Sequence, residues 1–186
     1  MIHTFAVYVD NKPGVLNRVA SLFRRRAFNI ESLTVGHTET AEVSRMTVVV
    51  DTDEYGARRL EAHLYKIVPV LRVENITRKP VIERDLALIK VAVSGESRTH
   101  VMQLVDVYRA RVVDVSADSL VVETTGTEDK IQSLIDVLRP FGIMEIVRTG
   151  VIAMVRGAGL ADRPGRRNGQ TLAAMDAVTD ASSGSV

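Results

Sequence analysis

Hydrophobic and polar residues alternate at the start of the chain, and the pattern then changes to a helical spacing. Phe5, Val7 and Val9 occupy every second position, which is typical of a strand with one buried face. Asn11-Lys12-Pro13-Gly14 ends the alternation, and Pro13 suits the first turn of a helix because no amide proton is needed there. The apolar residues that follow are spaced by three or four and predict that helix: Val15, Leu16, Val19, Leu22 and Phe23.

The remainder of the first 79 residues completes a βαββαβ order. Strands are expected over 30–35, 45–50 and 70–76, with a loop over 36–42. Asp51-Thr52-Asp53 can cap a second helix, because short polar side chains bind the free amides of a first turn. The apolar stripe of this helix is Leu60, Leu64 and Ile67.

A similar order follows Lys79-Pro80. Strands are expected over 86–93, 112–116, 120–125 and 143–147, with an extension or further strand over 151–155, and helices over 97–109 and 127–139. Two consecutive βαββαβ units predict an α+β protein with two ferredoxin-like domains, over 1–79 and 80–157. Residues 158–186 have few large apolar groups to bury, and we expect a flexible, disordered tail there.

Composition narrows the function without identifying it. The chain has 186 residues, a formal net charge of +1 and no cysteine, which excludes a disulfide scaffold and a cysteine nucleophile. No domain is basic enough to predict nucleic-acid binding. No stretch approaches the roughly 20 apolar residues of a membrane helix, and the start of the chain lacks the pattern of a signal peptide. We therefore expect a cytoplasmic protein that contacts neither nucleic acid nor membrane.

Few residues support a catalytic function. The four histidines, His3, His37, His63 and His100, do not have the spacing of metal ligands. Neither a nucleophile elbow nor a phosphate-binding loop of the G-x-x-x-x-G-K-[S/T] type occurs. An enzyme of unknown type built on tandem ferredoxin-like domains is an alternative that no residue favours.

The segment from Asp10 to Leu16 is the most informative, because it leads from a strand through a Pro-Gly turn into a helix. A helix N-terminus has free amides and a partial positive charge, so it binds carboxylates readily. Gly14 would allow a ligand close to the backbone, and Asn11 could hold a zwitterion through its donor and acceptor. In the alternative interpretation, Asn11 only caps the helix and Pro-Gly only turns the chain.

This segment resembles the start of an ACT domain, the small-ligand sensing module of amino-acid metabolism. Residues 26–35 and Ser44-Arg45-Met46-Thr47 resemble, more specifically, the small regulatory subunit of acetolactate synthase. Leu71-Arg72-Val73, Ser94-Gly95 and Thr149-Gly150-Val151 fit the same family, so the resemblance covers residues 1 to about 157. The tail beyond it exceeds the usual family length.

The resemblance implies a chain that has no chemistry of its own. Its partner would be the large catalytic subunit, which uses thiamine diphosphate, magnesium and FAD to join pyruvate to a second 2-keto acid in valine, leucine and isoleucine synthesis. The small subunit would activate this partner and mediate feedback inhibition by a branched-chain amino acid, usually L-valine. No cofactor is expected in this chain, which lacks a Gly-Asp-Gly diphosphate motif. The second domain would help to activate and anchor the large subunit.

The resemblance also implies site residues and a homodimer formed through the ACT domains. The effector would be bound across two neighbouring chains by six residues: Asn11, Gly14, Val15, Leu16, Asn29 and Ile30. Residues that would shape this site or face the partner are Glu31, Ser32, Leu33, Ser44, Arg45 and Met46. The main alternative is a free-standing ACT sensor that serves a different enzyme and responds to another amino acid.

Overall fold

The structure, a computed structural model, describes residues 1–157, so the tail predicted over 158–186 lies outside the described residues. The first half of the described chain consists of β1 (Ile2–Asp10), α1 (Val15–Arg25), β2 (Ile30–His37), β3 (Val43–Asp51), α2 (Glu54–Leu64) and β4 (Val70–Asn75). The second half consists of β5 (Val81–Ala92), α3 (Gly95–Val107), β6 (Arg111–Val115), β7 (Ser119–Gly126), α4 (Glu128–Leu138), the short 3₁₀ helix η1 (Arg139–Phe141), β8 (Ile143–Arg148) and β9 (Ile152–Val155).

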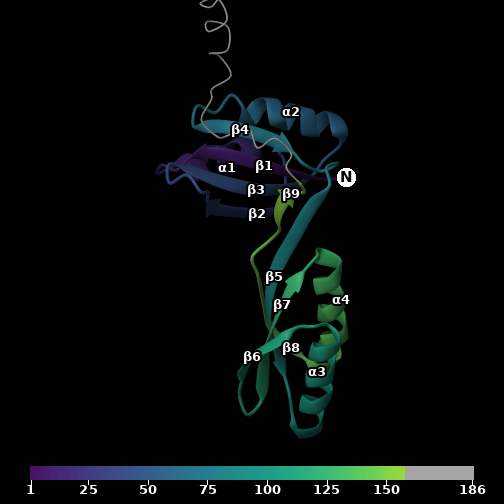
Figure 1. The fold of residues 1–186 in the computed structure, drawn as a ribbon. Helices are drawn as coiled ribbons and strands as arrows, with labels where there is room; N and C mark the ends of the chain where they lie inside the picture. The colour runs from purple at the N-terminus through teal and green to yellow at the C-terminus, as the bar shows by residue number, and fades with distance from the viewer. Residues whose placement is uncertain (158–186) are drawn as a thin grey trace, which may run out of the picture.

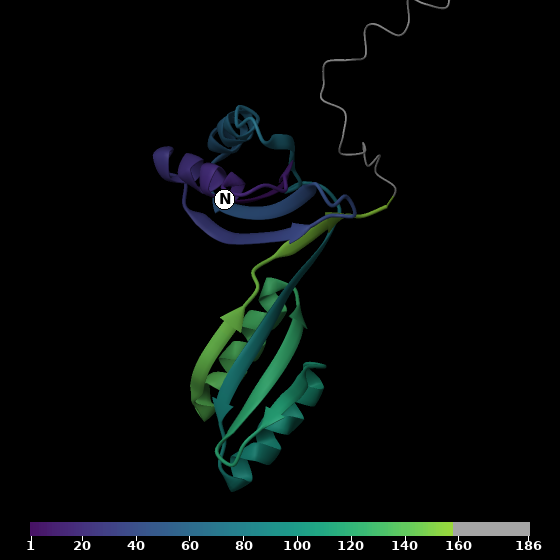
Figure 2. The same cartoon turned by 90° about the vertical axis from the view of Figure 1, so that its left-hand side faces the viewer.

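The first six elements form an antiparallel sheet in the order β2-β3-β1-β4, with α1 and α2 on one face (Figures 1 and 2). The helix-facing side chains of β1 are Phe5, Val7 and Val9, and all three are buried. They pack against the apolar side of α1, which includes Val19 and Phe23. The period-two strand and the helix expected here are confirmed, except that Leu16 is exposed and does not lie on the buried side of α1.

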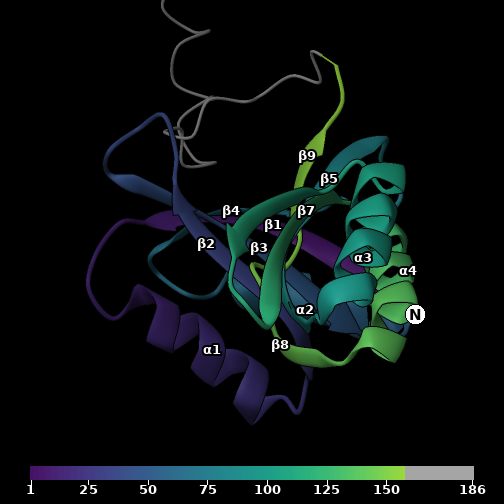
Figure 3. The same ribbon diagram turned by 90° about the horizontal axis from the view of Figure 1, so that it is seen from below.

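The second half repeats this arrangement in the order β6-β7-β5-β8, with α3 and α4 on one face (Figure 1). Its core joins Ile89 and Val91 of β5 to Ile131 and Leu134 of α4. The prediction of two ferredoxin-like βαββαβ units is confirmed. Seen from below, α3 and α4 lie on a different side from α1, so the helices of the two units do not form one continuous layer (Figure 3).

The long strand β5 connects the two sheets (Figures 1 and 2). Residues 85–92 pair with β7 in the second sheet, whereas residues 81–84 pair with β9. Val81 and Val155 of this two-stranded ribbon pack with Ala6 and Ile76 of the first unit and with Ala153 of β9. The ribbon therefore covers part of the sheet face that α1 and α2 leave open.

Three local predictions need correction. Pro13 does not lie in the first helical turn, because α1 begins at Val15 with Gly14 as its N-cap. β2 continues to His37 through pairing with Ser44, so the loop begins later than position 36. β5 begins at Val81 rather than Leu86, because residues 81–84 pair with β9, about 70 positions further along the chain.

Candidate functional site

Helix α1 begins on an open stretch of backbone. Gly14 has a φ of 81°, a left-handed conformation that other residues rarely adopt. Apart from its chain neighbours, no described atom lies within 4 Å of the place where its β-carbon would be, and no side chain caps the helix. The Val15 amide donates only to the Lys12 carbonyl oxygen, over 3.4 Å. A helix start of this kind can accept a carboxylate on its backbone amides.

Asn11 connects this turn to the loop between β2 and β3. Its Nδ2 donates to the Ala41 carbonyl oxygen over 3.0 Å and lies 3.4 Å from Nδ1 of His37. Its backbone amide donates to the Glu42 carbonyl oxygen over 2.7 Å. The alternative in which Asn11 caps α1 is wrong, since no side chain makes that bond. The side-chain amide of Asn11 instead contacts His37 at the end of β2 and Ala41 in the loop that follows.

Asn29 and Ile30 lie at the opposite end of β2. Ile30 pairs with Val50, whereas His37, next to Asn11, pairs with Ser44. Seven residue steps of about 3.3 Å separate positions 30 and 37, a distance of roughly 23 Å. The structure therefore brings Asn11, Gly14, Val15 and Leu16 together but does not bring Asn29 and Ile30 to them within one chain. Within the chain, Nδ2 of Asn29 donates to the exposed Glu31 carboxylate.

β2 forms an edge of its sheet. Among the described strands it pairs with β3 alone. The outer backbone groups of an edge strand are available to a strand from another chain. The two halves of the predicted effector site thus lie at the two ends of an edge strand.

The residues expected to shape the site or face a partner have different surroundings. Three of them are directed to the core of the first unit: Leu33, Ser44 and Met46. Ser32 and Arg45 lie on the other face of the sheet, where Ser32 contacts the segment that leads into β9 and Arg45 contacts β9 itself. Oγ of Ser32 accepts a hydrogen bond from the Val151 amide over 3.1 Å, and Arg45 donates to the Ala153 carbonyl oxygen.

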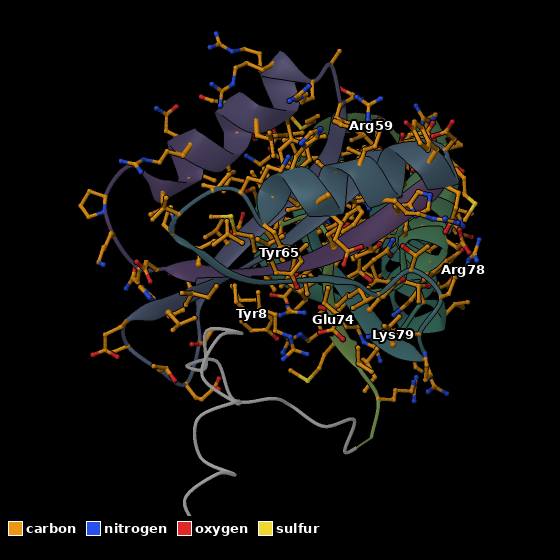
Figure 4. The ribbon with its side chains drawn as sticks, turned by 90° about the horizontal axis from the view of Figure 1, so that it is seen from above. Tyr8, Arg59, Tyr65, Glu74, Arg78 and Lys79 are labelled. Carbon is orange, nitrogen blue, oxygen red and sulfur yellow. The ribbon has the colours of Figure 1, made fainter. Side chains whose placement is uncertain are left out.

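The open face of the first sheet also has a cationic cluster around Tyr8. The guanidinium carbons of Arg45 and Arg72 lie 5.7 and 5.6 Å from the centre of the Tyr8 ring, within the range of cation–π attraction. Arg72 also forms an ion pair with Glu74 over 2.9 Å, and Lys79 contacts the same carboxylate. In Figure 4, Tyr8, Glu74 and Lys79 lie on the side of the sheet away from α1, whereas Arg59 lies among the helices.

Sequence reasoning did not predict the contacts of four residues, although Thr34 lies in the stretch 31–35 that was expected to shape the site or face the partner. His37 was read as a scattered histidine in a loop, yet it lies beside Asn11. Thr34, Thr149 and Val151 form contacts between the two units, over 3.4 Å from Thr34 Oγ1 to the Thr149 carbonyl oxygen and 3.2 Å to that of Val151. The only available signal was Thr149-Gly150-Val151 between two strands, and it does not indicate which strand the segment would contact.

One titratable group of the first unit is clearly perturbed. Loss of solvation and the positive charges of Arg26, Lys66 and Arg59 lower the pKa of His63 at the end of α2. This histidine is remote in sequence from the predicted site, and we assign it no part in binding.

The described residues include neither a metal-binding cluster nor a membrane-spanning helix. Residues 1–157 contain no group of three or more His, Asp or Glu side chains placed to hold a metal ion. No helix among them is long and apolar enough to cross a membrane.

Comparisons with known proteins match both units. Residues 5–72 match the family model for the ACT domain of acetohydroxyacid synthase small subunits, and residues 84–157 match the model for the small subunit of acetolactate synthase. The chain belongs to the acetolactate synthase small-subunit family. A "Probable acetolactate synthase small subunit" from Archaeoglobus fulgidus is 52% identical over 157 residues, which are 84% of this chain and 98% of that protein.

Further relatives support this family membership. The acetolactate synthase small subunit of Bacillus subtilis is 50% identical over 80% of this chain and 87% of its own length. The crystal structure of the acetolactate synthase small subunit from Thermotoga maritima is 38% identical, with a TM-score of 0.79 over 84% of this chain and 98% of that one. The resemblance seen in the sequence is confirmed, and with it an ACT-type first unit.

Proposed function

We propose that this chain is the regulatory small subunit of an acetolactate synthase, which activates a large catalytic subunit and mediates feedback inhibition by a branched-chain amino acid, L-valine in the first instance. The family membership of both units carries the proposal. Residues 1–79 are the effector-binding and dimerisation domain, and residues 80–157 are the second domain that helps to activate and anchor the partner. Thiamine diphosphate, magnesium and FAD belong to the large subunit, and the complex is cytoplasmic.

The position of the candidate site at both ends of an edge strand supports a dimer. In a two-fold dimer that joins two β2 edges, the strands run antiparallel, so the start of one lies beside the end of the other. Asn29 of the partner subunit would then approach Asn11 and the start of α1. Each dimer would form two equivalent sites, each incomplete without the second chain.

The chemistry of these residues fits an amino acid. The amides of Gly14, Val15 and Leu16 receive the carboxylate, and Asn11 with the partner's Asn29 holds the polar end. The partner's Ile30 contacts the side chain of the effector. An apolar contact of this kind distinguishes valine from alanine by about 1–3 kcal/mol for each carbon, and separates valine from isoleucine only weakly.

Calorimetric titration with L-valine, with D-valine as the control, tests the binding part of this proposal. Reconstitution with the large subunit tests the regulatory part, with acetolactate formation as the readout. We expect L-valine alone to bind, the chain to raise the activity of the large subunit, and L-valine to reverse that increase. A chain that binds an amino acid but does not activate the large subunit would indicate a free-standing ACT sensor instead.

A further inference from the structure

Strand β2, whose two ends lie next to the two halves of the candidate effector site, also holds the segment that connects the two domains. Ser32 and Thr34 lie on the face of β2 away from α1 and α2. Both contact residues 149–151, which we call the linker because they lead from β8 to β9. The Val151 amide donates to Oγ of Ser32 over 3.1 Å, and Oγ1 of Thr34 donates to the Val151 carbonyl oxygen over 3.2 Å. The linker is therefore bound to β2 through both its amide and its carbonyl groups.

The backbone of the linker is shaped for this contact. Gly150 has a φ of 83°, and a β-carbon at this position would lie 2.4 Å from Oγ of Ser32. Any larger residue would both strain the backbone and displace the Ser32 hydroxyl. The glycine thus allows the linker to lie directly against β2.

The other end of the linker is fixed to the C-terminal domain. Thr149 donates through Oγ1 to the Asp85 carboxylate over 3.2 Å and accepts from the Leu86 amide over 3.1 Å. Asp85 is 2% exposed and also accepts from Nε of Arg148 over 2.7 Å. Arg148 lies 3.7 Å from Glu128 in the first turn of α4. A movement of residue 149 would therefore be transmitted to β5, β8 and α4.

The space around the linker is not completely filled. A cavity of about 90 Å³ lies between the two sheets, lined by Thr4 and Val49 from the first and by Asp85, Glu128 and Val151 among others from the second unit and the linker. Because Val151 lines this cavity, a displacement of the linker would change its shape.

From these contacts we infer that Ser32 and Thr34 transmit effector binding from β2 to the C-terminal domain through the linker. The inference rests on the proposed function, since it takes an effector site at the ends of β2 as given. Ligand that binds across the β2 edge favours one position of that strand, and the two hydroxyls carry the linker with it. Ser32 and Thr34 are positioning residues, because they act on the linker and not on the effector.

The variant Ser32→Ala/Thr34→Val tests this inference in the reconstituted complex of small and large subunits. It removes both hydroxyls and preserves the approximate shape of the side chains. Thr34→Ser is the matched control, because it keeps the hydroxyl that binds the linker. Each variant is measured twice: L-valine affinity by calorimetry, and L-valine inhibition of acetolactate formation.

The inference predicts that the double variant keeps its affinity for L-valine while inhibition by L-valine is weakened. The double variant should bind L-valine within about threefold of the parent, while the concentration for half inhibition rises about tenfold or maximal inhibition is lost, within the range of typical allosteric couplings. Thr34→Ser should behave as the parent. Full inhibition in the double variant, or a parallel loss of binding and inhibition, would overturn the inference. Failure of the parent complex to bind or respond to L-valine would instead refute the proposed function, and the inference with it.

A second measurement does not depend on valine. The chain has no cysteine, so Ala62→Cys on α2 and Gln103→Cys on α3, both at exposed positions, allow two spin labels to be placed specifically. The labelled chain is diluted with an excess of unlabelled chain, so that few dimers carry labels on both subunits, and pulsed electron spin resonance then reports the distance between the two domains of one chain. We expect one narrow distribution in the parent and a broader one in Ser32→Ala/Thr34→Val. Identical distributions in the two proteins would show that the hydroxyls do not position the linker.

Discussion

A β-carbon on Gly150 would lie 2.4 Å from the hydroxyl oxygen of Ser32, although the two residues belong to different domains and are 118 positions apart. The Ser32 hydroxyl could rotate away, but it would then lose the hydrogen bond from the Val151 amide. We expect Gly150→Ala to lower the free energy of unfolding by about 1–2 kcal/mol through its positive φ, and by about 1 kcal/mol more through the lost hydrogen bond. Urea denaturation measures both contributions together.

Gly14→Ala is the matched control for this variant. Gly14 has a similar φ of 81°, and no described atom outside its own chain neighbours lies within 4 Å of a β-carbon placed there. The control should therefore show the backbone contribution alone. In a Ser32→Ala background, Gly150→Ala should cost no more than Gly14→Ala. Equal costs of the two glycine variants in the parent would contradict the assigned contact.

Two variants of Gly14 separate the effect of a negative charge in the effector site from the effect of backbone strain. Because Gly14 has a positive φ, any side chain there strains the turn, and Gly14→Asp alone would mix strain with repulsion. Gly14→Asn has almost the same shape without the negative charge, and both residues tolerate the left-handed region better than most. We expect Gly14→Asp to abolish L-valine binding and inhibition, while Gly14→Asn retains part of both. Calorimetry compares the two variants: equal loss in both would mean that the charge at position 14 does not control binding, and would contradict an effect of repulsion on the effector carboxylate.

Variants of Asn29 and Asn11 test whether each effector site is formed by two chains. Asn29→Ala should remove L-valine inhibition, because the effector would lose a polar partner supplied from the second chain. Asn11→Ala should have the same effect, although the two side chains lie at opposite ends of β2 in one chain. Mixing the two variants should restore one complete site in each heterodimer, measurable as partial recovery of L-valine binding. No recovery on mixing would argue against a site built from two chains.

The sequence was sufficient to predict each domain but not how the domains meet. Phe5, Val7 and Val9 alternate because one face of β1 is buried, so local periodicity was enough to identify the strand. Val81 belongs to β5 only because it pairs with Val155, and no local pattern indicates a partner so distant in the chain. The same holds for the candidate site. Gly14 was visible as a turn, whereas the contact of Asn11 with His37 depends on how the β2–β3 loop folds back.

The buried carboxylate between the domains should be important for stability. Asp85 is 2% exposed and accepts hydrogen bonds from Arg148 and Thr149. Removing one member of a buried pair leaves the other charge without its compensation, and we expect Asp85→Ala to cost about 3 kcal/mol. Asp10→Ala, which breaks the exposed pair with Lys12, is the control and should cost less than about 1 kcal/mol. Chemical denaturation compares them, and similar costs would contradict a structural role for Asp85.

His63 should make stability depend on pH in the weakly acidic range. Loss of solvation and the charges of Arg26, Lys66 and Arg59 lower its pKa in the folded chain below 6.5, its value when unfolded. As the pH falls below 6.5, the unfolded chain therefore binds more protons than the folded one, and the free energy of unfolding decreases. Above about pH 7.5 the histidine is neutral in both states and this contribution vanishes. Urea denaturation of the parent and of His63→Gln at pH 8, 6.5 and 5 measures it: the variant should gain stability relative to the parent as the pH falls. A difference in stability between the two proteins that does not change with pH would contradict the lowered pKa of His63.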